Sequence, residues 1–280
     1  MPSVSVIIPV HNRRALLERA MDSVARQSFG DFECIVVDDA SDRPCDDLPG
    51  FADSRFTCLR LSCRSGVSRA RNEGVKRSSA PWIAFLDSDD VWMTHKLLRQ
   101  IEWTRRNPCF KIVQCREIWI RNGVRVNPPK THEKRQGDLF AESLERCMIT
   151  PSSVMLRRGL FYDMDGFNES LPACEDYDLW LRICVHYPVG LVDEYLLVRY
   201  GGHDDQLSSS VAVLDRFRIR ALLGLLHRGE LTVRQESLVR KQLIKRASVC
   251  AQGYGRRGNR ERYEQYRTIA SEIAGEAVNA

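Results

Sequence analysis

Hydrophobic residues in the first hundred positions fall into short runs separated by segments with helical spacing. Four of these runs are β-branched or aromatic and are typical of buried strands: residues 4–9, 32–37, 56–61 and 82–86. Between the first two, Leu17, Met21 and Val24 mark one face of a helix that Asn12 can cap. Strands separated by helices indicate parallel β-α-β units with right-handed crossovers.

The pattern beyond Asp90 is less regular but still mixes helix and strand. We expect helices at residues 94–106, 138–147 and 175–187, and strands at residues 110–119, 153–156, 189–192 and 195–200. From residue 211 to the end no strand pattern occurs, and a helical segment is predicted. The predicted fold class is therefore α/β, a Rossmann-like, mostly parallel sheet flanked by helices, with a C-terminal helical extension.

Charge and cysteine content restrict the cellular setting. The net charge of +5 is uneven, because residues 211–280 hold 14 Lys/Arg against 7 Asp/Glu while the rest is near neutral. Such basic helices suit a homodimer contact or a peripheral contact with a membrane, and no motif for nucleic acid occurs. The ten cysteines form no C-x-x-C, and no signal peptide or membrane-spanning run is evident. We expect a cytoplasmic protein, at most peripheral at the inner face of a membrane.

An acidic cluster follows the fourth predicted strand. Asp87, Ser88, Asp89 and Asp90 place three carboxylates within four residues, and such carboxylates repel one another unless a cation is held between them. Mg²⁺ and Mn²⁺ prefer carboxylate oxygens completed by phosphate and water. The simpler alternative is an acidic turn in which one Asp caps the next helix.

Three other polar clusters are candidates for the same ligand-binding site as the acidic cluster. Asp38-Asp39 ends the second strand, and ligands of open parallel sheets bind beyond the carboxyl ends of the strands. The stretch from Gly66 to Gly74 is neither a dinucleotide fingerprint nor a P-loop, yet its arginines suit phosphate. Glu175-Asp176 could supply a general base, or merely complement a helix dipole.

The series SVIIPVHNR, VVDDAS, GVSRARNEG, FLDSDD and CEDYDLWLR, in this order, resembles the family 2 glycosyltransferases of GT-A fold over about residues 3–210. The resemblance implies an inverting transfer of a sugar from a nucleotide-diphosphate-sugar, a UDP-sugar in our prediction, to an acceptor hydroxyl in polysaccharide or glycoconjugate synthesis. It divides the chain into a nucleotide-sugar-binding half (1–100), an acceptor-binding half of the same domain (101–210) and a helical extension (211–280). The acceptor would be a saccharide or a lipid-linked sugar.

Matching motif positions imply roles for individual residues. The resemblance implies that the nucleotide is contacted by Pro9, His11, Asp39, Arg71, Asp87 and Ser88. Within this set, Asp39 would bond the imide of a uracil-type base, and His11 stands where the family often has an aromatic residue. Asp89 and His203 would bind Mn²⁺ or Mg²⁺, and Asp176 would be the catalytic base.

Two other functions remain as alternatives. The run Asp87-Ser88-Asp89-Asp90-Val91 also fits the nucleophile loop of haloacid-dehalogenase-like phosphatases, in which the first Asp attacks phosphorus. That loop usually opens its domain, whereas three predicted strands precede it here. A catalytically silent protein that binds nucleotide or a partner is the other alternative; loss of Asp89 or Asp176 would mark it, and both are present.

Overall fold

The computed structural model describes residues 1–202 and 214–278. Its strands are β1 (Val4–Val10), β2 (Phe32–Asp38), β3 (Phe56–Arg60), β4 (Trp82–Phe85), β5 (Val91–Trp92), β6 (Ile112–Arg121), β7 (Val124–Val126), β8 (Met155–Arg157) and β9 (Gly190–Gly201). Its helices are α1 (Arg14–Ala25), α2 (Val67–Arg77), α3 (Lys96–Arg106), α4 (Phe140–Glu145), α5 (Arg158–Asp163), α6 (Glu175–His186), α8 (Asp215–His227), α9 (Val233–Arg256) and α10 (Arg260–Val278). Short 3-10 turns lie at η1 (Pro49–Ala52), η2 (Lys130–His132) and η3 (Pro151–Ser153).

The first four strands form the parallel part of one sheet, in the order β3-β2-β1-β4. Every residue of β1 is buried, as expected for a strand covered on both faces. The chain moves outward from β1 to β2 and β3, then returns to place β4 on the other side of β1. A crevice is therefore expected between the ends of β1 and β4, at the switch in strand order.

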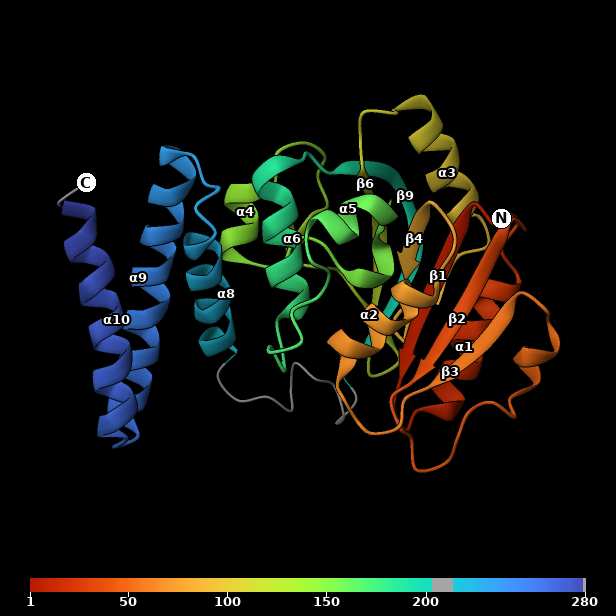
Figure 1. Ribbon diagram of the computed structural model, residues 1–280, viewed down its shortest axis with the longest axis horizontal. Helices are drawn as coiled ribbons and strands as arrows, with labels where there is room; N and C mark the ends of the chain where they lie inside the picture. The colour runs from red at the N-terminus through yellow and green to blue at the C-terminus, as the bar shows by residue number, and fades with distance from the viewer. Residues whose placement is uncertain (203–213, 279–280) are drawn as a thin grey trace.

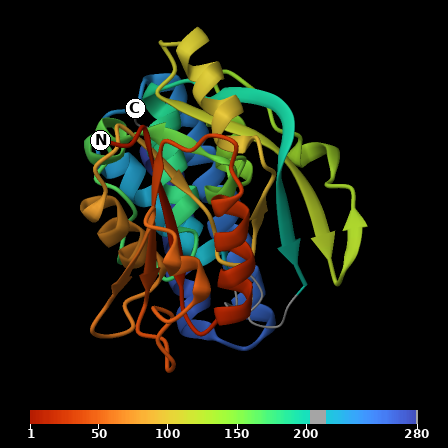
Figure 2. The same cartoon turned by 90° about the vertical axis from the view of Figure 1, so that its right-hand side faces the viewer.

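Beyond β4 the sheet becomes mixed. β8 lies antiparallel to both β4 and β6, whereas β6 and β9 run parallel with a register irregularity near Arg116. The two strands predicted at residues 189–192 and 195–200 are one continuous strand, β9. Figure 2 shows β6, β7 and β9 curling away from the parallel strands, so that they form a separate wall of the molecule. The predicted α/β class is confirmed, with its parallel part confined mainly to the first half.

Helix α1 differs in detail from the prediction. Arg13, not Asn12, is the residue that precedes the helix, and no side chain caps it. Asn12 instead adopts a left-handed conformation (φ 56°), and its side chain exchanges hydrogen bonds with Asp42. This arrangement ties the end of β1 to the loop after β2, at the edge of the expected crevice.

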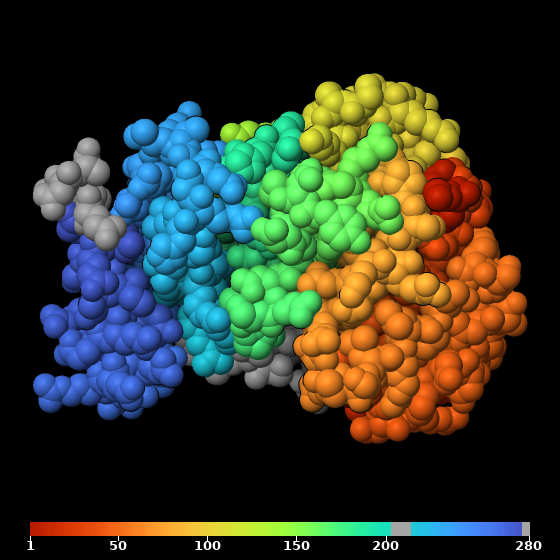
Figure 3. Space-filling view, in the orientation of Figure 1, coloured from red at the N-terminus to blue at the C-terminus, as the bar shows by residue number. Residues whose placement is uncertain are grey.

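The C-terminal helices form one end of the molecule, opposite the N-terminal strands (Figures 1 and 3). α8 packs against α6, and α9 packs on α8 and α10. Arg246 on α9 donates to the carbonyl oxygens of Leu144 (3.1 Å) and Glu145 (2.6 Å), so the extension is fixed to α4. Among the described residues, none of these helices is sufficiently long and apolar to cross a membrane.

Candidate active site

The ends of β1 and β2 are joined by hydrogen bonds. His11 Nδ1 donates to the Asp39 carbonyl oxygen (2.9 Å), and the Asp39 amide donates to the Val10 carbonyl oxygen (2.8 Å). Pro9 lies within buried β1, in register with Val37. His11 and Asp39 thus lie together at the end of the sheet, as predicted.

Asp39 is buried and uses both carboxylate oxygens. Oδ1 accepts from the Ser65 amide (2.6 Å) and Oδ2 from the Gly66 amide (2.8 Å). Gly66 has φ +91°, a conformation that favours glycine, and α2 begins directly after it. Asp39 therefore fixes the loop that leads into α2, while each oxygen retains a further lone pair for a ligand.

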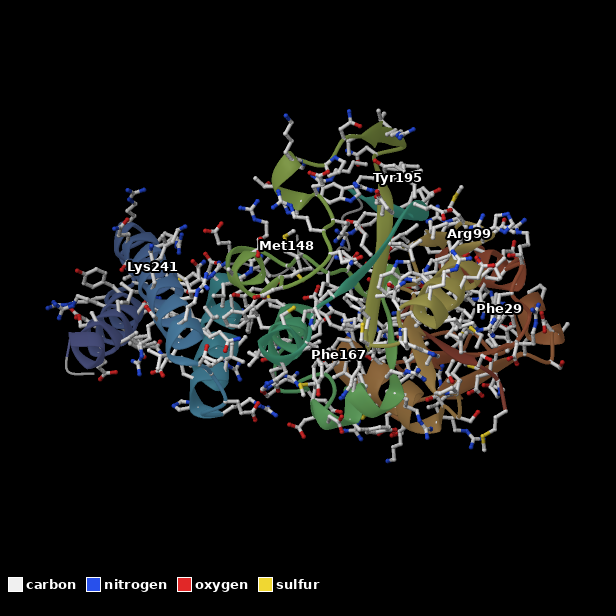
Figure 4. The ribbon with its side chains drawn as sticks, turned by 90° about the horizontal axis from the view of Figure 1, so that it is seen from above. Phe29, Arg99, Met148, Phe167, Tyr195 and Lys241 are labelled. Atoms are coloured by element: carbon white, nitrogen blue, oxygen red, sulfur yellow. The ribbon has the colours of Figure 1, made fainter. Side chains whose placement is uncertain are left out.

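Arg71 connects the two halves of the site. Its side chain is buried and donates to Asp87 Oδ1 (2.6 Å) and to Glu175 Oε1 (2.7 Å). The guanidinium also lies 5.0 Å from the ring centroid of Phe167, a buried residue near the middle of the molecule (Figure 4). Burial alone would lower the pKa of Arg71, but the charges of Asp87 and Glu175 raise it, so the group stays cationic.

The acidic cluster lies directly after β4. The Asp87 amide donates to Ser152 Oγ (3.0 Å), and Ser88 is buried. Asp89 Oδ2 forms an ion pair with Arg13 Nη1 (2.9 Å). Asp90 is turned towards β9, where it accepts the Tyr200 amide (3.0 Å). Burial raises the pKa of Asp90 well above its usual value, and the charges of Asp89 and Asp87 raise it further.

Two carboxylates of this cluster suit a divalent cation. The side chains of Asp87 and Asp89 are 32% and 13% exposed, so both can reach a ligand. Within residues 1–202 and 214–278, no three His, Cys, Asp or Glu side chains converge to hold a metal. A set of two carboxylates fits Mn²⁺ or Mg²⁺ that completes its shell with phosphate and water. His203, the other predicted ligand, lies outside the described residues.

The pair Glu175-Asp176 opens α6, and its two members are not equivalent. Glu175 is buried against Arg71, and burial raises its pKa. Asp176 is half-buried; its Oδ1 accepts the Tyr177 amide (2.7 Å) and its Oδ2 accepts the Cys147 thiol (3.4 Å). Cys174 precedes the helix in a left-handed conformation (φ 62°), which directs the chain into α6. Asp176 thus offers a carboxylate held in a fixed orientation at the start of α6.

Two arginines of the site were not predicted from the sequence. Arg13 pairs with Asp89, and Arg199 on β9 lies among carboxylates. Burial lowers the pKa of Arg199, but Glu117, Asp90, Asp87 and Asp176 raise it, in that order of strength, and the net shift is upward. Their only sequence signal was a cation beside or within an apolar strand, which is too common to single them out.

The fold, with its carboxylates at the strand switch, is the GT-A fold of glycosyltransferases. The structure resembles that of S. aureus TarS, residues 1–349, solved in complex with UDP-GlcNAc. The TM-score is 0.68, with 99% of this chain and 92% of that chain covered at 16% sequence identity, a likeness that supports the fold alone.

Sequence similarity identifies the family. A family model described as Glycosyl transferase family 2 matches residues 5–164, and the chain belongs to this family. WfaP of Escherichia coli, a UDP-Glc:alpha-D-GlcNAc-diphosphoundecaprenol beta-1,3-glucosyltransferase, is 31% identical over 212 residues, 72% of this chain and 79% of that one. WfgD of the same species, with the same described activity, is 33% identical over 64% of this chain and 69% of that one. Membership of this family sets aside the phosphatase alternative for Asp87 and Asp89.

Proposed function

We propose that this enzyme transfers a sugar from a UDP-sugar, with inversion, to a hydroxyl of a lipid-linked saccharide. The observation that carries the proposal is the position of Asp176. Its carboxylate forms no ion pair with a described residue, and Arg71 ties the neighbouring Glu175 to Asp87. The residue that directly precedes the proposed base is therefore joined through Arg71 to a carboxylate of the acidic cluster. The described activities of WfaP and WfgD support the choice of UDP-sugar and lipid-linked acceptor.

The donor would lie along the ends of β1, β2 and β4. Asp39 would accept the imide N–H of the base through its remaining lone pairs, with Pro9 and His11 beside the base and ribose. Arg71, Asp87 and Ser88 would line the path of the nucleotide. A divalent cation bound by Asp89, with His203 as an additional ligand, would neutralise negative charge that develops on the leaving diphosphate.

Asp176 would accept the proton of the acceptor hydroxyl as that oxygen attacks the anomeric carbon. In an inverting displacement the attacking oxygen and the leaving diphosphate stand on opposite faces of the sugar. The required base therefore belongs opposite the acidic cluster, on the acceptor side. The amide of Tyr177 and the thiol of Cys147 orient the Asp176 carboxylate for this step. General-base catalysis of this kind contributes about 10²–10⁴-fold in rate.

Replacing Asp176 with Asn tests the base. Asp176→Asn should lower turnover by about 10²–10⁴-fold, because the amide cannot accept the proton, while the Kd for UDP stays unchanged. Glu261→Gln, which removes a carboxylate from the exposed surface of α10, is the matched control. Near-normal turnover by Asp176→Asn would show that another group is the base.

The donor is identified by thermal-shift measurements with UDP-, dTDP- and GDP-sugars, with and without Mn²⁺. A ligand that binds only the folded chain stabilises it in proportion to the logarithm of its concentration over its Kd. We expect the largest shift with a UDP-sugar and Mn²⁺. A larger shift with a GDP-sugar would contradict the role given to Asp39.

A further inference from the structure

Two arginines converge on one indole ring in the wall formed by β6, β7 and β9. Arg121 Cζ lies 5.4 Å and Arg199 Cζ 5.5 Å from the ring of Trp119. The strand register explains this: Trp119 is paired with Arg199 on β9, and Arg121 is two residues further along β6, on the same face. His132 lies edge-on, with its ring centroid 5.6 Å from that of Trp119. We call Trp119, Arg121, His132 and Arg199 the Trp119 platform.

The guanidiniums of the platform lack a hydrogen-bonded acidic partner among the described residues, although the charges of Glu117, Asp90, Asp87 and Asp176 raise the pKa of Arg199. Within residues 1–202 and 214–278, the guanidiniums of Arg121 and Arg199 form no hydrogen bond or ion pair. Glu117, the nearest acidic group of this face, is already bonded by Trp119 Nε1 (3.0 Å) and Thr150 Oγ1 (2.8 Å). A mostly buried guanidinium without hydrogen bonds is costly unless an anion binds it.

The platform borders the reacting groups on the acceptor side. The charges of Asp90, Asp87 and Asp176 raise the pKa of Arg199, as expected for a guanidinium on the side of β9 that faces the acidic cluster and the proposed base. The next residue of β9, Tyr200, donates its amide to Asp90. Arg121 is exposed and lies further out along the same face, at the end of β6. An anion spanning the two arginines would therefore extend outward from the site of proton transfer.

We propose that Arg121 and Arg199, packed against Trp119, bind a phosphate or diphosphate group of the acceptor. The planar fork of a guanidinium matches phosphate oxygens, and two such forks along one face suit a diphosphate. The enzyme would then select acceptor sugars that carry an anomeric diphosphate over neutral glycosides. This inference rests on the proposed function and assigns the site that recognises the acceptor.

The test compares two acceptor probes of the same sugar and tail. These are GlcNAc-α-diphosphoundecanol and neutral undecyl α-GlcNAc, titrated calorimetrically into the full chain with and without UDP and Mn²⁺. The wild-type protein should bind the diphosphate probe about tenfold tighter or more, since each charge-assisted hydrogen bond contributes that much. Arg121→Gln and Arg199→Gln should each remove most of this preference and leave the Kd of the neutral probe unchanged.

Arg125→Gln is the matched control. Arg125 is exposed on β7 and is paired with Ile120, so its side chain belongs to the opposite face of the hairpin from Arg121. The Arg125→Gln substitution removes the same charge as Arg121→Gln, but this variant should still prefer the diphosphate probe. Arg121 is exposed and forms no hydrogen bond or ion pair with a described residue, so the Arg121→Gln variant should fold even if Arg199→Gln unfolds.

Three results would overturn the inference. The first is equal binding of the two probes by the wild-type protein. The second is an equal preference for the diphosphate probe in Arg121→Gln and Arg125→Gln. The third is a loss of UDP affinity in Arg199→Gln together with an unchanged probe preference in Arg121→Gln. The last would assign Arg199 to the donor diphosphate instead. Failure of the proposed function would be seen separately, because the wild-type protein would then neither bind UDP nor transfer sugar. In that case the titration without UDP would still measure whether the Trp119 platform binds the diphosphate probe.

Discussion

Arg71 and Glu175 form a buried ion pair with 2.7 Å between Nη1 and Oε1, although they lie 104 residues apart in the chain. The pair joins α2, which follows the loop held by Asp39, to the first turn of α6, which carries the proposed base. Arg71 also binds Asp87 at 2.6 Å, so one guanidinium holds the two sides of the site at a fixed separation. A single side chain thus links the acidic cluster after β4 to the start of α6.

Replacing Arg71 with Met should unfold the protein at a lower temperature and abolish transfer. Removing one partner of a buried ion pair costs about 3–5 kcal/mol, because the remaining carboxylates lose their counter-charge. The combined variant Arg71→Met/Glu175→Gln should lose less stability than the sum of the two single changes. Thermal unfolding and turnover measure both effects, with Arg69→Met, an exposed arginine of the same helix, as control. Additive losses would show that the two residues are not coupled.

The sequence predicts the parallel half of the fold well because its signals are local. β1, β2 and β4 are predominantly apolar runs, and their ends carry the polar residues that the structure brings together. His11, Asp39 and Asp87 are found at these ends, as strand order predicts. The mixed half is harder to predict because β8 is only three residues long and pairs with strands distant in the chain.

The partners of each site residue could not be predicted from the sequence. The motif containing Arg71 suggested a phosphate or base contact, but only the tertiary structure shows that this side chain lies between Asp87 and Glu175. Likewise, Arg199 lies beside Trp119 because β9 pairs in parallel with β6, a long-range contact without a local signature.

Asp89 and Asp90 should respond oppositely to the same isosteric change. Asp89→Asn should remove the Mn²⁺ dependence of UDP-sugar binding, because an amide oxygen is a weaker ligand than a carboxylate. Asp90→Asn should retain it, since Asp90 is 3% exposed and accepts the Tyr200 amide, a bond that an amide oxygen can also accept. Thermal shifts with UDP-sugar, with and without Mn²⁺, measure the difference. A metal dependence lost in Asp90→Asn and kept in Asp89→Asn would reverse the two assignments.

Lys96 makes stability depend on pH. The side chain is fully buried, with Nζ 3.6 Å from the Trp92 ring, and burial lowers the pKa of Lys96 from 10.5 to about 7. Between these values the unfolded chain binds a proton that the folded chain lacks, so this group adds stability as pH rises through that range. Below about pH 7 the folded chain must hold a charged lysine in its core.

Lys96→Met should therefore raise the free energy of unfolding by about 1–4 kcal/mol below neutral pH, with a smaller gain as pH approaches 10. Urea unfolding at about pH 6 and about pH 9 measures the gain at each pH. Lys241→Met, an exposed lysine of α9, should show no such pH dependence. A gain for Lys96→Met that is equal at both pH values, or larger at the higher one, would contradict the lowered pKa.

Gly74 allows α2 to approach the sheet closely enough to position Arg71, one turn earlier on the same helix. A Cβ at position 74 would lie 2.5 Å from Ile7 Cγ2 and 3.0 Å from Val37 Cγ2. Gly74→Ala should therefore cost about 1–3 kcal/mol of stability, despite the better helix propensity of alanine, and slow transfer by displacing Arg71.

The matched control for Gly74→Ala is Gly224→Ala on α8, where an added Cβ meets no atom within 4 Å. That change should stabilise the protein by up to about 1 kcal/mol, because alanine favours the helix. Combining Gly74→Ala with Ile7→Ala removes the atom that clashes, so the pair should cost less than the sum of its members. Urea unfolding of Gly74→Ala, Gly224→Ala, Ile7→Ala and the double variant measures these changes in the free energy of unfolding. If Gly74→Ala behaved like Gly224→Ala, α2 could move away from the sheet without loss, and the close approach would not be what positions Arg71.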